Sequence, residues 1–312
     1  MSLERGLVTV ELRPPRLEDA ADLAAAMDEF GRVNEGDRIS KAEVETWLGT
    51  PSLDVERDAR VAVADGKPVG YGDIFNSSRE GRVIWSYAGA HPSRLDALPP
   101  LLDFVEARAA ERASPDGVLK MFAPERADAL RNLLESRGFA FENFSLRMAA
   151  ELDDEPPNPE WPQGIWVRTF RGDEDARAVY KVHQETFSDL RDHSRDSFED
   201  WRHWSLREGL DPELWFLAEA DGDLQGVCLC RPSWEGDPNF GWISVIGVRR
   251  PWRGRGLGLA LLRHSFRELR ARGKTRVGLG VDAENATGAV RLYEKAGMEV
   301  TSRRLWYRKA VG

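Results

Sequence analysis

The chain contains little cysteine and no long apolar run, and these two features exclude several classes of protein. Its two cysteines, Cys228 and Cys230, lie two positions apart, where a strand would place both on one face, and no second pair is present to complete a zinc site. No stretch reaches the roughly 20 apolar residues that cross a bilayer, and the start of the chain lacks the apolar core of a secretory signal. We therefore expect a cytoplasmic protein with structural thiols, no metal and no membrane contact.

The chain also lacks an excess of positive charge: its 53 Asp and Glu residues outnumber its 44 Lys and Arg residues, which gives a net charge of −9. A general nucleic-acid binder has to attract phosphate, so this balance argues against that class of partner. The length of 312 residues exceeds that of one usual core and favours two domains of roughly 150 residues each. We expect a two-domain protein, monomeric or homodimeric, without a nucleic-acid partner.

The two halves of the chain repeat one pattern. Each begins with a short alternating strand and an amphipathic helix, over Val8–Phe30 and Gly164–Phe187, continues with a hairpin at an Asp-Gly turn, and ends with a helix closed by glycine and a strand. Equivalent residues keep nearly the same offset along the chain. The anchor pairs are Arg13 and Arg168, Asp65 and Asp221, and Gly138 and Gly297, at offsets of 155, 156 and 159 positions.

The order of elements predicts the fold class. Each half reads as strand, helix, helix, hairpin, strand, helix, strand, helix, strand, which is typical of an α/β domain with a mixed, largely antiparallel sheet and one parallel crossover. Between the halves, Asp153–Gly164 carries four prolines, which cannot lie inside a helix or a central strand. We expect tandem domains over residues 1–152 and 164–312, joined by a proline-rich linker over residues 153–163.

A turn rich in glycine and arginine follows an apolar strand of the second half. The segment Gly247–Leu262 reads GVRRPWRGRGLGLALL. Alternate glycines over Gly254–Gly258 let the backbone take positive φ and approach a ligand closely, and the helix that follows offers unpaired N–H groups and the positive end of its dipole. Arg253 and Arg255 add charge-assisted donors. These features predict a pyrophosphate site, although a solvated basic helix behind a flexible loop has the same composition.

This turn resembles motif A of the GNAT acyltransferase superfamily, whose pattern Arg/Gln-x-x-Gly-x-Gly/Ala falls here on Arg253, Gly256 and Gly258. The downstream segment GLGVDAENATGAVRLYEKAGMEV is similar to the next conserved block of the same superfamily. The repeated plan is similar to that of its tandem two-domain members, among them the mycothiol synthases. The resemblance implies an N-acetyltransferase that uses acetyl-CoA, or another acyl-CoA, as its donor.

The resemblance also implies how the donor is bound. The turn would hold the pyrophosphate, and the open edge of the preceding strand would pair with the pantetheine arm and polarise the thioester carbonyl. Asn285 matches an asparagine that contacts the donor in the superfamily, and it is equally suited to cap the next helix. The residues assigned to acetyl-CoA are Ile246, Gly247, Val248, Arg253, Gly254, Arg255, Gly256, Leu257, Gly258 and Asn285.

Two catalytic roles follow from the same resemblance. Tyr293 matches the frequent general acid, which would protonate the leaving thiolate, although a tyrosine of the core would fit the same helix position. An amine acceptor also needs a general base, and Trp242–Val248 contains no acid where the superfamily often has a glutamate. Glu235, Asp237 and Asp282, or a chain of waters, remain open as the base.

The acceptor is expected to be a small-molecule amine, such as an amino sugar, an amino acid or an antibiotic-like amine. Acidic side chains in the segment that follows the first helix of the second half would attract its cation. These acids are Asp189, Asp192, Asp196, Glu199 and Asp200.

The first half lacks the glycine turn. At the equivalent place Asp96 would repel phosphate, and Pro99 and Pro100 remove two backbone donors. We expect this half to be non-catalytic and the second half to carry the reaction. A different function remains open, namely a non-catalytic acyl-CoA-binding sensor built from two decayed acyltransferase domains.

Overall fold

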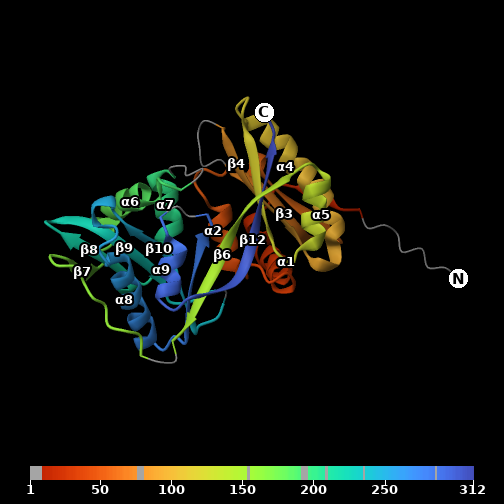
Figure 1. Cartoon of the computed structure of the whole chain (residues 1–312). Coiled ribbons are helices and arrows are strands. Elements are labelled where there is room, and N and C mark those ends of the chain that lie inside the picture. The colour runs from red at the N-terminus through yellow and green to blue at the C-terminus, as the bar shows by residue number, and fades with distance from the viewer. Residues whose placement is uncertain are drawn as a thin grey trace. The chain divides into compact units, whose positions relative to one another are not determined.

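The computed structural model describes residues 9–75, 81–152, 155–190, 196–207, 210–234, 236–284 and 287–312. The chain forms two compact units, coloured along the sequence in Figure 1. Unit 1 consists of Met1–Glu142 and Arg304–Gly312, and unit 2 of Asn143–Arg303. Each unit has a mixed sheet with helices on both faces, which confirms the predicted α/β class.

In unit 1 the sheet runs in the order β1-β2-β3-β4-β5-β12, and only β4 and β5 are parallel. Its strands are β1 (Glu11–Arg13), β2 (Ala59–Ala64), β3 (Lys67–Phe75), β4 (Val83–Ala90), β5 (Val118–Pro124) and β12 (Glu299–Ala310). Of β12, only the residues from Arg304 onward belong to unit 1. Its α-helices are α1 (Ala20–Val33), α2 (Lys41–Leu48), α3 (Val55–Asp58), α4 (Leu98–Arg112) and α5 (Asp128–Ser136), and short 3-10 helices span Leu17–Asp19 and Pro92–Ala97.

The sheet of unit 2 repeats this topology in the order β7-β8-β9-β10-β11-β6, with β10 and β11 as the parallel pair. Its strands are β6 (Ala140–Glu151), β7 (Trp166–Thr169), β8 (Trp215–Ala220), β9 (Asp223–Arg231), β10 (Phe240–Val248) and β11 (Arg276–Asp282). Its α-helices are α6 (Asp173–Phe187), α7 (Phe198–Ser205), α8 (Leu257–Ala271) and α9 (Ala289–Lys295), with 3-10 helices over Pro212–Leu214 and Arg250–Trp252.

The last strand of each sequence repeat completes the sheet of the other unit. Residues Ser145–Glu151 of β6 pair with β11, and Arg304–Ala310 of β12 pair with β5. The compact units therefore divide within these two strands, whereas the repeat and the prolines divide the sequence at 153–163. The physical reason is that β5 and β11 each need a neighbouring strand for their backbone groups, and the last strand of either repeat has the same length, 12 residues.

The anchors of the repeat have equivalent structural roles. Arg13 donates two hydrogen bonds of 2.7 Å to Asp19 in unit 1, and Arg168 donates two, of 2.6 and 2.8 Å, to Asp175 in unit 2. Each pair ties the first strand of a unit to the start of its first helix. Positive φ angles recur at Asp65 and Asp221 (50° and 53°) and at Gly138 and Gly297 (83° and 94°). The internal repeat is thus a structural one.

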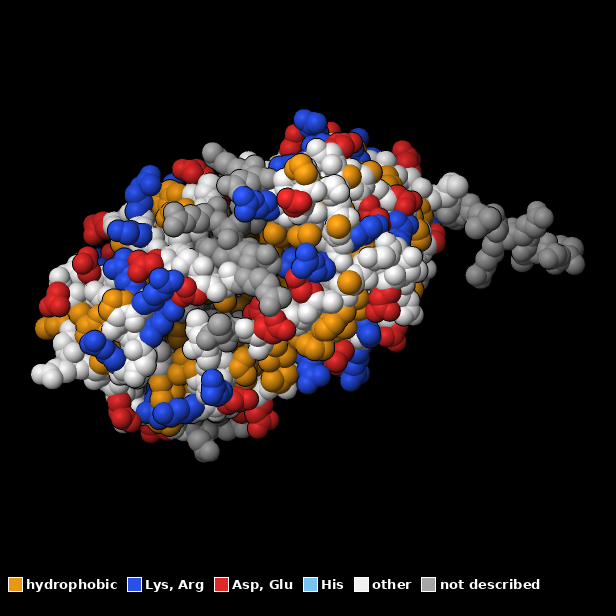
Figure 2. Space-filling view, turned by 45° about the horizontal axis from the view of Figure 1, so that its top comes forward, with side chains coloured by type: hydrophobic (Ala, Val, Ile, Leu, Met, Phe, Trp, Pro, Cys, Tyr) orange, Lys and Arg blue, Asp and Glu red, His pale blue; other side chains and the backbone are white. Residues whose placement is uncertain are grey.

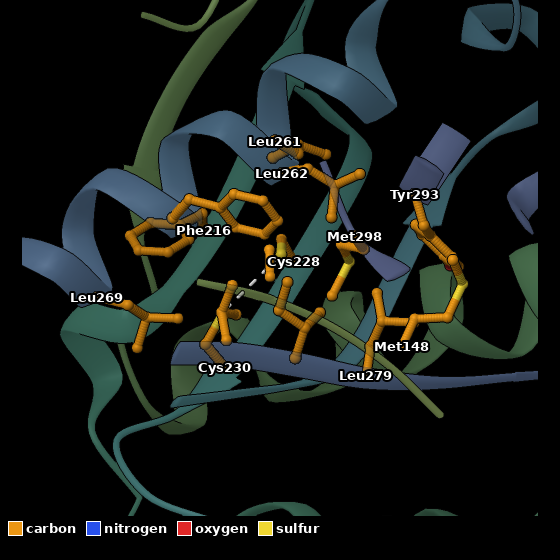
Figure 3. Packing of buried hydrophobic residues seen from close by; sticks show 14 of the residues in the cluster. Met148, Phe216, Cys228, Cys230, Leu261, Leu262, Leu269, Leu279, Tyr293 and Met298 are labelled. Atoms are coloured by element: carbon orange, nitrogen blue, oxygen red, sulfur yellow. Dashed lines mark hydrogen bonds between the residues drawn. The ribbon is translucent and has the colours of Figure 1, made fainter. Parts of the chain in front are cut away.

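Unit 2 has an apolar core on each face of its sheet. One cluster lies under α6 and α7, and the other lies under α8 and α9 and contains Cys228, Cys230 and Tyr293. Figure 3 shows the two thiols side by side in this second cluster; their sulfur atoms are 3.8 Å apart and both side chains are fully buried. Both cysteines are free, as a structural role for them predicts.

Surface charge is mixed on the face that Figure 2 shows, where basic and acidic side chains are interspersed. Within the described ranges, no helix combines the length and the hydropathy that crossing a bilayer requires. No group of three or more His, Cys, Asp or Glu side chains in that part of the chain is placed to hold a metal ion.

Asp73, on β3, is fully buried in unit 1. The Tyr71 hydroxyl and the backbone N–H of Tyr87 donate hydrogen bonds of 3.0 and 3.1 Å to its carboxyl group. Burial nevertheless dominates and raises the pKa of Asp73 to about 7. The folded protein therefore favours the protonated form of this side chain at pH values below about 7.

This raised pKa predicts how the stability of unit 1 depends on pH. The folded-state pKa of Asp73 lies above its unfolded value, so its contribution is complete below about pH 4 and is lost as the pH rises to about 7. Relative to Asp73→Asn, the wild type should lose on the order of 2–3 kcal/mol of unfolding free energy between pH 5 and pH 8. Urea unfolding at both pH values measures this. Asp22→Asn, on an exposed face of α1, is the control, and parallel behaviour of wild type and Asp73→Asn would contradict the assignment.

Candidate functional site

Strands β10 and β11 are paired over only part of their length. The ladder joins Phe240–Ile243 to Arg276–Leu279, whereas β10 continues to Val248 and stays paired with β9 on its other side. The register shifts directly after Ile243, as in a β-bulge, which bends a strand where its pairing ends. Among the residues that the structure describes, no strand pairs with the last residues of β10 on the β11 side.

The geometry of β10 identifies which backbone groups line this opening. The carbonyl oxygen of Gly247 lies 3.2 Å from where a Cβ of Gly226, on β9, would be, so Gly247 directs its backbone groups towards β9. Since neighbouring residues of a strand point these groups to opposite sides, Ile246 and Val248 face the opening. Gly247 serves another purpose: a Cβ there would lie 2.3 Å from Oγ1 of Thr186, on α6. Its missing side chain lets the end of α6 pack against β10.

The glycine turn leads from β10 into α8. Gly254 and Gly256 have φ angles of 72° and 88°, which side chains other than glycine rarely adopt. Gly256 caps α8 without a side-chain hydrogen bond, and the first turn of α8 holds no acid. Among the described residues, no acceptor takes the N–H groups of Gly254, Arg255, Gly256, Leu257, Gly258 and Leu259. These N–H groups are thus available to an anion, and the pyrophosphate site stays a prediction.

Arg253 points back into the protein from this turn. Its Nε donates to the Val248 carbonyl at 2.9 Å, its Nη1 to Asp189 at 2.6 Å and its Nη2 to the Thr186 carbonyl at 3.4 Å. Arg250 binds the other oxygen of the same carboxylate. Hydrogen bonds from Arg250 and then Arg253 lower the pKa of Asp189 to about 2. The expectation that Asp189 attracts the acceptor amine is therefore wrong, because its charge is already matched by two arginines of the chain.

Arg255 differs from its two neighbours in the turn. Its guanidinium lies 5.1 Å from the ring centre of Trp252, in a cation–π geometry, and its side chain is exposed. Within the described part of the chain, no carboxylate forms an ion pair with it. As far as the described residues go, Arg255 is thus the arginine of the turn whose charge is open to a ligand.

Tyr293 lies on α9, 6% exposed, in the apolar cluster under α8 and α9. Figure 3 shows its ring beside Met148, and the same cluster includes Ile246 and Val248 of the open strand. Burial, with a smaller contribution from Cys228, raises the pKa of Tyr293 above its usual value. The phenol therefore keeps its proton at neutral pH, beside the strand that parts from β11.

One of the predicted bases lies at the open end of the sheet. Asp282 ends β11, and its carboxylate accepts hydrogen bonds from Asn143 Nδ2 at 3.2 and 3.3 Å and from the backbone N–H of Glu284 at 2.8 Å. Asn143, on β6, is a residue that sequence reasoning missed, since 139 positions separate the two. Asp237 lies in the turn that leads into β10, at the opposite end of that strand.

Other predicted residues are outside this arrangement. Asp200 accepts a hydrogen bond from the hydroxyl of Ser197, which caps α7, and Asp196 and Glu199 are exposed on the same segment. Three predicted residues, Glu235, Asn285 and Asp192, lie outside the described residues.

Comparison with known proteins decides the family. Residues 176–298 match the family model described as "Acetyltransferase (GNAT) family". A solved GCN5-related N-acetyltransferase from Sphaerobacter thermophilus is 34% identical, with a TM-score of 0.74, and the match covers 97% of this chain and 96% of that one. The chain belongs to the GNAT family.

Two further likenesses bear on this GNAT chain. The mycothiol acetyltransferase of Thermobispora bispora is 36% identical over 194 residues, which are 61% of this chain and 65% of the relative; the chain thus spans somewhat less than two thirds of that relative's length. A tandem GNAT protein from the clavulanic acid biosynthesis pathway has a TM-score of 0.73 at 16% identity, covering 97% of this chain and 99% of that one. At that identity the second likeness shows the fold alone, and this fold is a tandem one.

The first GNAT copy has the opening without the anion turn. Strand β4 pairs with β5 only over Val83–Ser86 and then continues to Ala90, as β10 does in unit 2. In its turn, however, Arg94 is paired with Asp96 at 2.8 Å. The following helix begins with two prolines, at 99 and 100, which have no N–H to offer. The two copies share the strand geometry and differ in the groups that could meet a phosphate.

The basic residues of α8 have partners in the proline-rich segment. Arg263 pairs with Glu160 at 3.0 Å, and Arg267 donates to the Pro156 carbonyl at 2.8 Å. These contacts fasten the segment along the helix. Part of the basic stretch therefore has a structural role, and its positive charge is not left open to a ligand.

The packing of α6 on β10 gives a prediction for Gly247→Ala. The added methyl group would collide with Thr186, and overpacking of this kind costs about 1–3 kcal/mol. Thermal unfolding measures the loss. Gly280→Ala is the matched control, because its Cβ would meet only Trp242, at 4.0 Å, and should change stability little. Equal melting temperatures for the two variants would show that α6 does not need the bare backbone at Gly247.

Proposed function

We propose that the chain is an acetyl-CoA-dependent N-acetyltransferase, and that unit 2 transfers the acetyl group to a small-molecule amine. The observation that carries this proposal is the partial ladder of β10 and β11: an unpaired strand end leads directly into the glycine turn and the open N-terminus of α8. A long donor with amide groups in its arm and a diphosphate near its other end suits that combination. Family membership supports the reaction class.

The donor is proposed to bind mainly through backbone. The N–H groups from Gly254 to Leu259 would hold the diphosphate, assisted by the helix dipole and by Arg255. The backbone groups of Ile246 and the N–H of Val248 would pair with the pantetheine arm and stabilise the oxyanion that forms on the thioester carbonyl; the Val248 carbonyl already accepts from Arg253. Arg253 would contribute indirectly, by holding the turn against the end of β10. No step of this chemistry calls for a metal.

Acetyl transfer then needs one proton removed and one supplied. The neutral amine attacks the thioester carbon, and the carbon–sulfur bond breaks as the tetrahedral intermediate collapses. Asp282, oriented by Asn143, is proposed to take the proton of the amine. Tyr293 is proposed to protonate the departing thiolate, because its phenol is kept neutral by burial in the cluster beside the open strand.

A small molecule is the proposed class of acceptor. The curated relative is named for mycothiol, which is a small molecule and not a protein, and this favours an amino sugar, an amino acid or an antibiotic-like amine. Unit 1 is proposed to be non-catalytic, since its turn offers a paired arginine and two prolines in place of open donors.

A second function, a non-catalytic acyl-CoA-binding sensor, is favoured by one observation. The open strand from Trp242 to Val248 carries no acid, so an acceptor amine meets no base on that strand. Turnover separates the two functions. If acetyl-CoA raises the melting temperature but no amine in a broad panel releases coenzyme A above the background rate, the sensor is the correct function.

The role of Tyr293 is tested by Tyr293→Phe in the same assay. Loss of a general acid should lower kcat by about 10²-fold, while the dissociation constant of coenzyme A stays within twofold because the ring remains in place. The rate at which free thiol is released gives kcat, and isothermal titration calorimetry gives the dissociation constant of coenzyme A. Unchanged kcat would remove Tyr293 from the mechanism and leave it as a residue of the core.

The role of Asp282 is tested by Asp282→Asn. The base acts in its ionised form, so the variant should lose about 10²-fold in kcat/KM for the amine at neutral pH. The deficit should shrink as the pH approaches the pKa of the amine itself, where the acceptor is already neutral. Asp237→Asn is the control and should leave the pH profile unchanged. A deficit that is constant with pH would point to a structural role for Asp282.

A further inference from the structure

A carboxylate of the chain already binds two arginines of the segment that leads into the proposed diphosphate turn. Asp189 accepts from Arg253 at 2.6 Å through one oxygen and from Arg250 through the other. Its side chain is 23% exposed, so solvent and solutes reach the pair. The pKa of about 2 means that the carboxylate is ionised at any working pH.

The position of this carboxylate is fixed by the scaffold. Asp189 follows the C-terminal end of α6, and that end is held on β10 by the contact between Thr186 and Gly247 and by an ion pair of 3.0 Å between Glu185 and Arg249. A negative charge at a helix C-terminus opposes the helix dipole. Asp189 therefore does not stabilise α6. Its own charge is stabilised at this position by Arg250 and Arg253.

The ion pairs change what the turn offers to a ligand. Of the three arginines between positions 250 and 255, two are neutralised, and Arg255 alone keeps a charge without an acidic partner among the described residues. Without Asp189, the charges of Arg250 and Arg253 would be unpaired beside the turn, although Arg253 would keep its hydrogen bonds to the Val248 and Thr186 carbonyls. Unpaired guanidinium charge attracts phosphate, and charge-assisted hydrogen bonds are strong. The carboxylate thus lowers the affinity of the turn for phosphate.

A lower affinity is useful for the proposed reaction. Acetyl-CoA and coenzyme A carry identical phosphates, so contacts to the phosphates bind donor, transition state and product alike. Uniform binding of this type lowers KM without accelerating the chemical step, and tight binding of the product slows its release.

We propose that Asp189 is an internal competitor for the phosphates of the donor: it occupies Arg250 and Arg253 so that coenzyme A is anchored by backbone N–H groups and Arg255 and can leave after transfer. Asp189 acts through the two arginines and is a positioning residue in this sense. The kinetic part rests on the proposed acetyltransferase function, whereas the binding part concerns the affinity for coenzyme A alone.

The test is Asp189→Asn, which keeps the shape of the side chain and removes its charge. Calorimetry with coenzyme A should give a dissociation constant lower by about tenfold, or 1.4 kcal/mol, and a steeper weakening with salt, because more charge pairs are exposed to screening. In turnover, KM for acetyl-CoA and kcat should fall together. Asp173→Asn, which removes an exposed carboxylate at the other end of α6 whose partner is Arg202, is the control and should leave the dissociation constant within twofold.

A pair of arginine variants tests the same proposal with Asp189 in place. Arg255→Gln should weaken coenzyme A binding by about tenfold, whereas Arg250→Gln should change it by less than twofold. Weaker or unaltered binding in Asp189→Asn, or equal losses in the two arginine variants, would overturn the proposal. Calorimetry needs no acceptor, so a failure to find any acetyl transfer would refute the proposed function without deciding this result.

Discussion

The site depends on one constraint, the parting of β10 from β11 after Ile243. A free strand edge is normally a liability, since its backbone groups seek another strand. Here the bulge turns β10 away, Thr186 of α6 covers it at Gly247, and the cluster that contains Tyr293 packs against its other face. Because both faces are filled, the edge is held open in one geometry, and a ligand that pairs with it meets preformed backbone groups.

The arginines around the turn show that one residue type serves three purposes within a few positions. Arg253 connects the end of β10 to the end of α6 through hydrogen bonds. Arg250 binds the same carboxylate as Arg253, that of Asp189, and the exposed Arg255 lies over the ring of Trp252. On α8, further arginines fasten the proline-rich segment. A count of basic residues therefore overstates the positive charge that a ligand encounters.

Local patterns gave much of the fold. The Asp-Gly hairpins, the glycine that closes each late helix and the acidic start of each first helix are short-range signals, and they occur in equivalent places in both units. The glycine turn at the start of α8 is equally local. The same reasoning could not find the pairs Arg253–Asp189 and Asn143–Asp282, which are 64 and 139 positions apart. It also could not foresee where the ladder of β10 ends, since apolar alternation continues beyond Ile243.

The exchange of last strands has a consequence for synthesis on the ribosome. The edge of β5 acquires its partner only when residues 304–310 emerge, so the part of the chain made first is completed last. Strand β6 likewise lacks its partner β11 until more than a hundred further residues have been translated. A nascent chain with two uncovered edges is a substrate for chaperones, and cutting the gene at the proline-rich segment would deprive each sheet of its sixth strand.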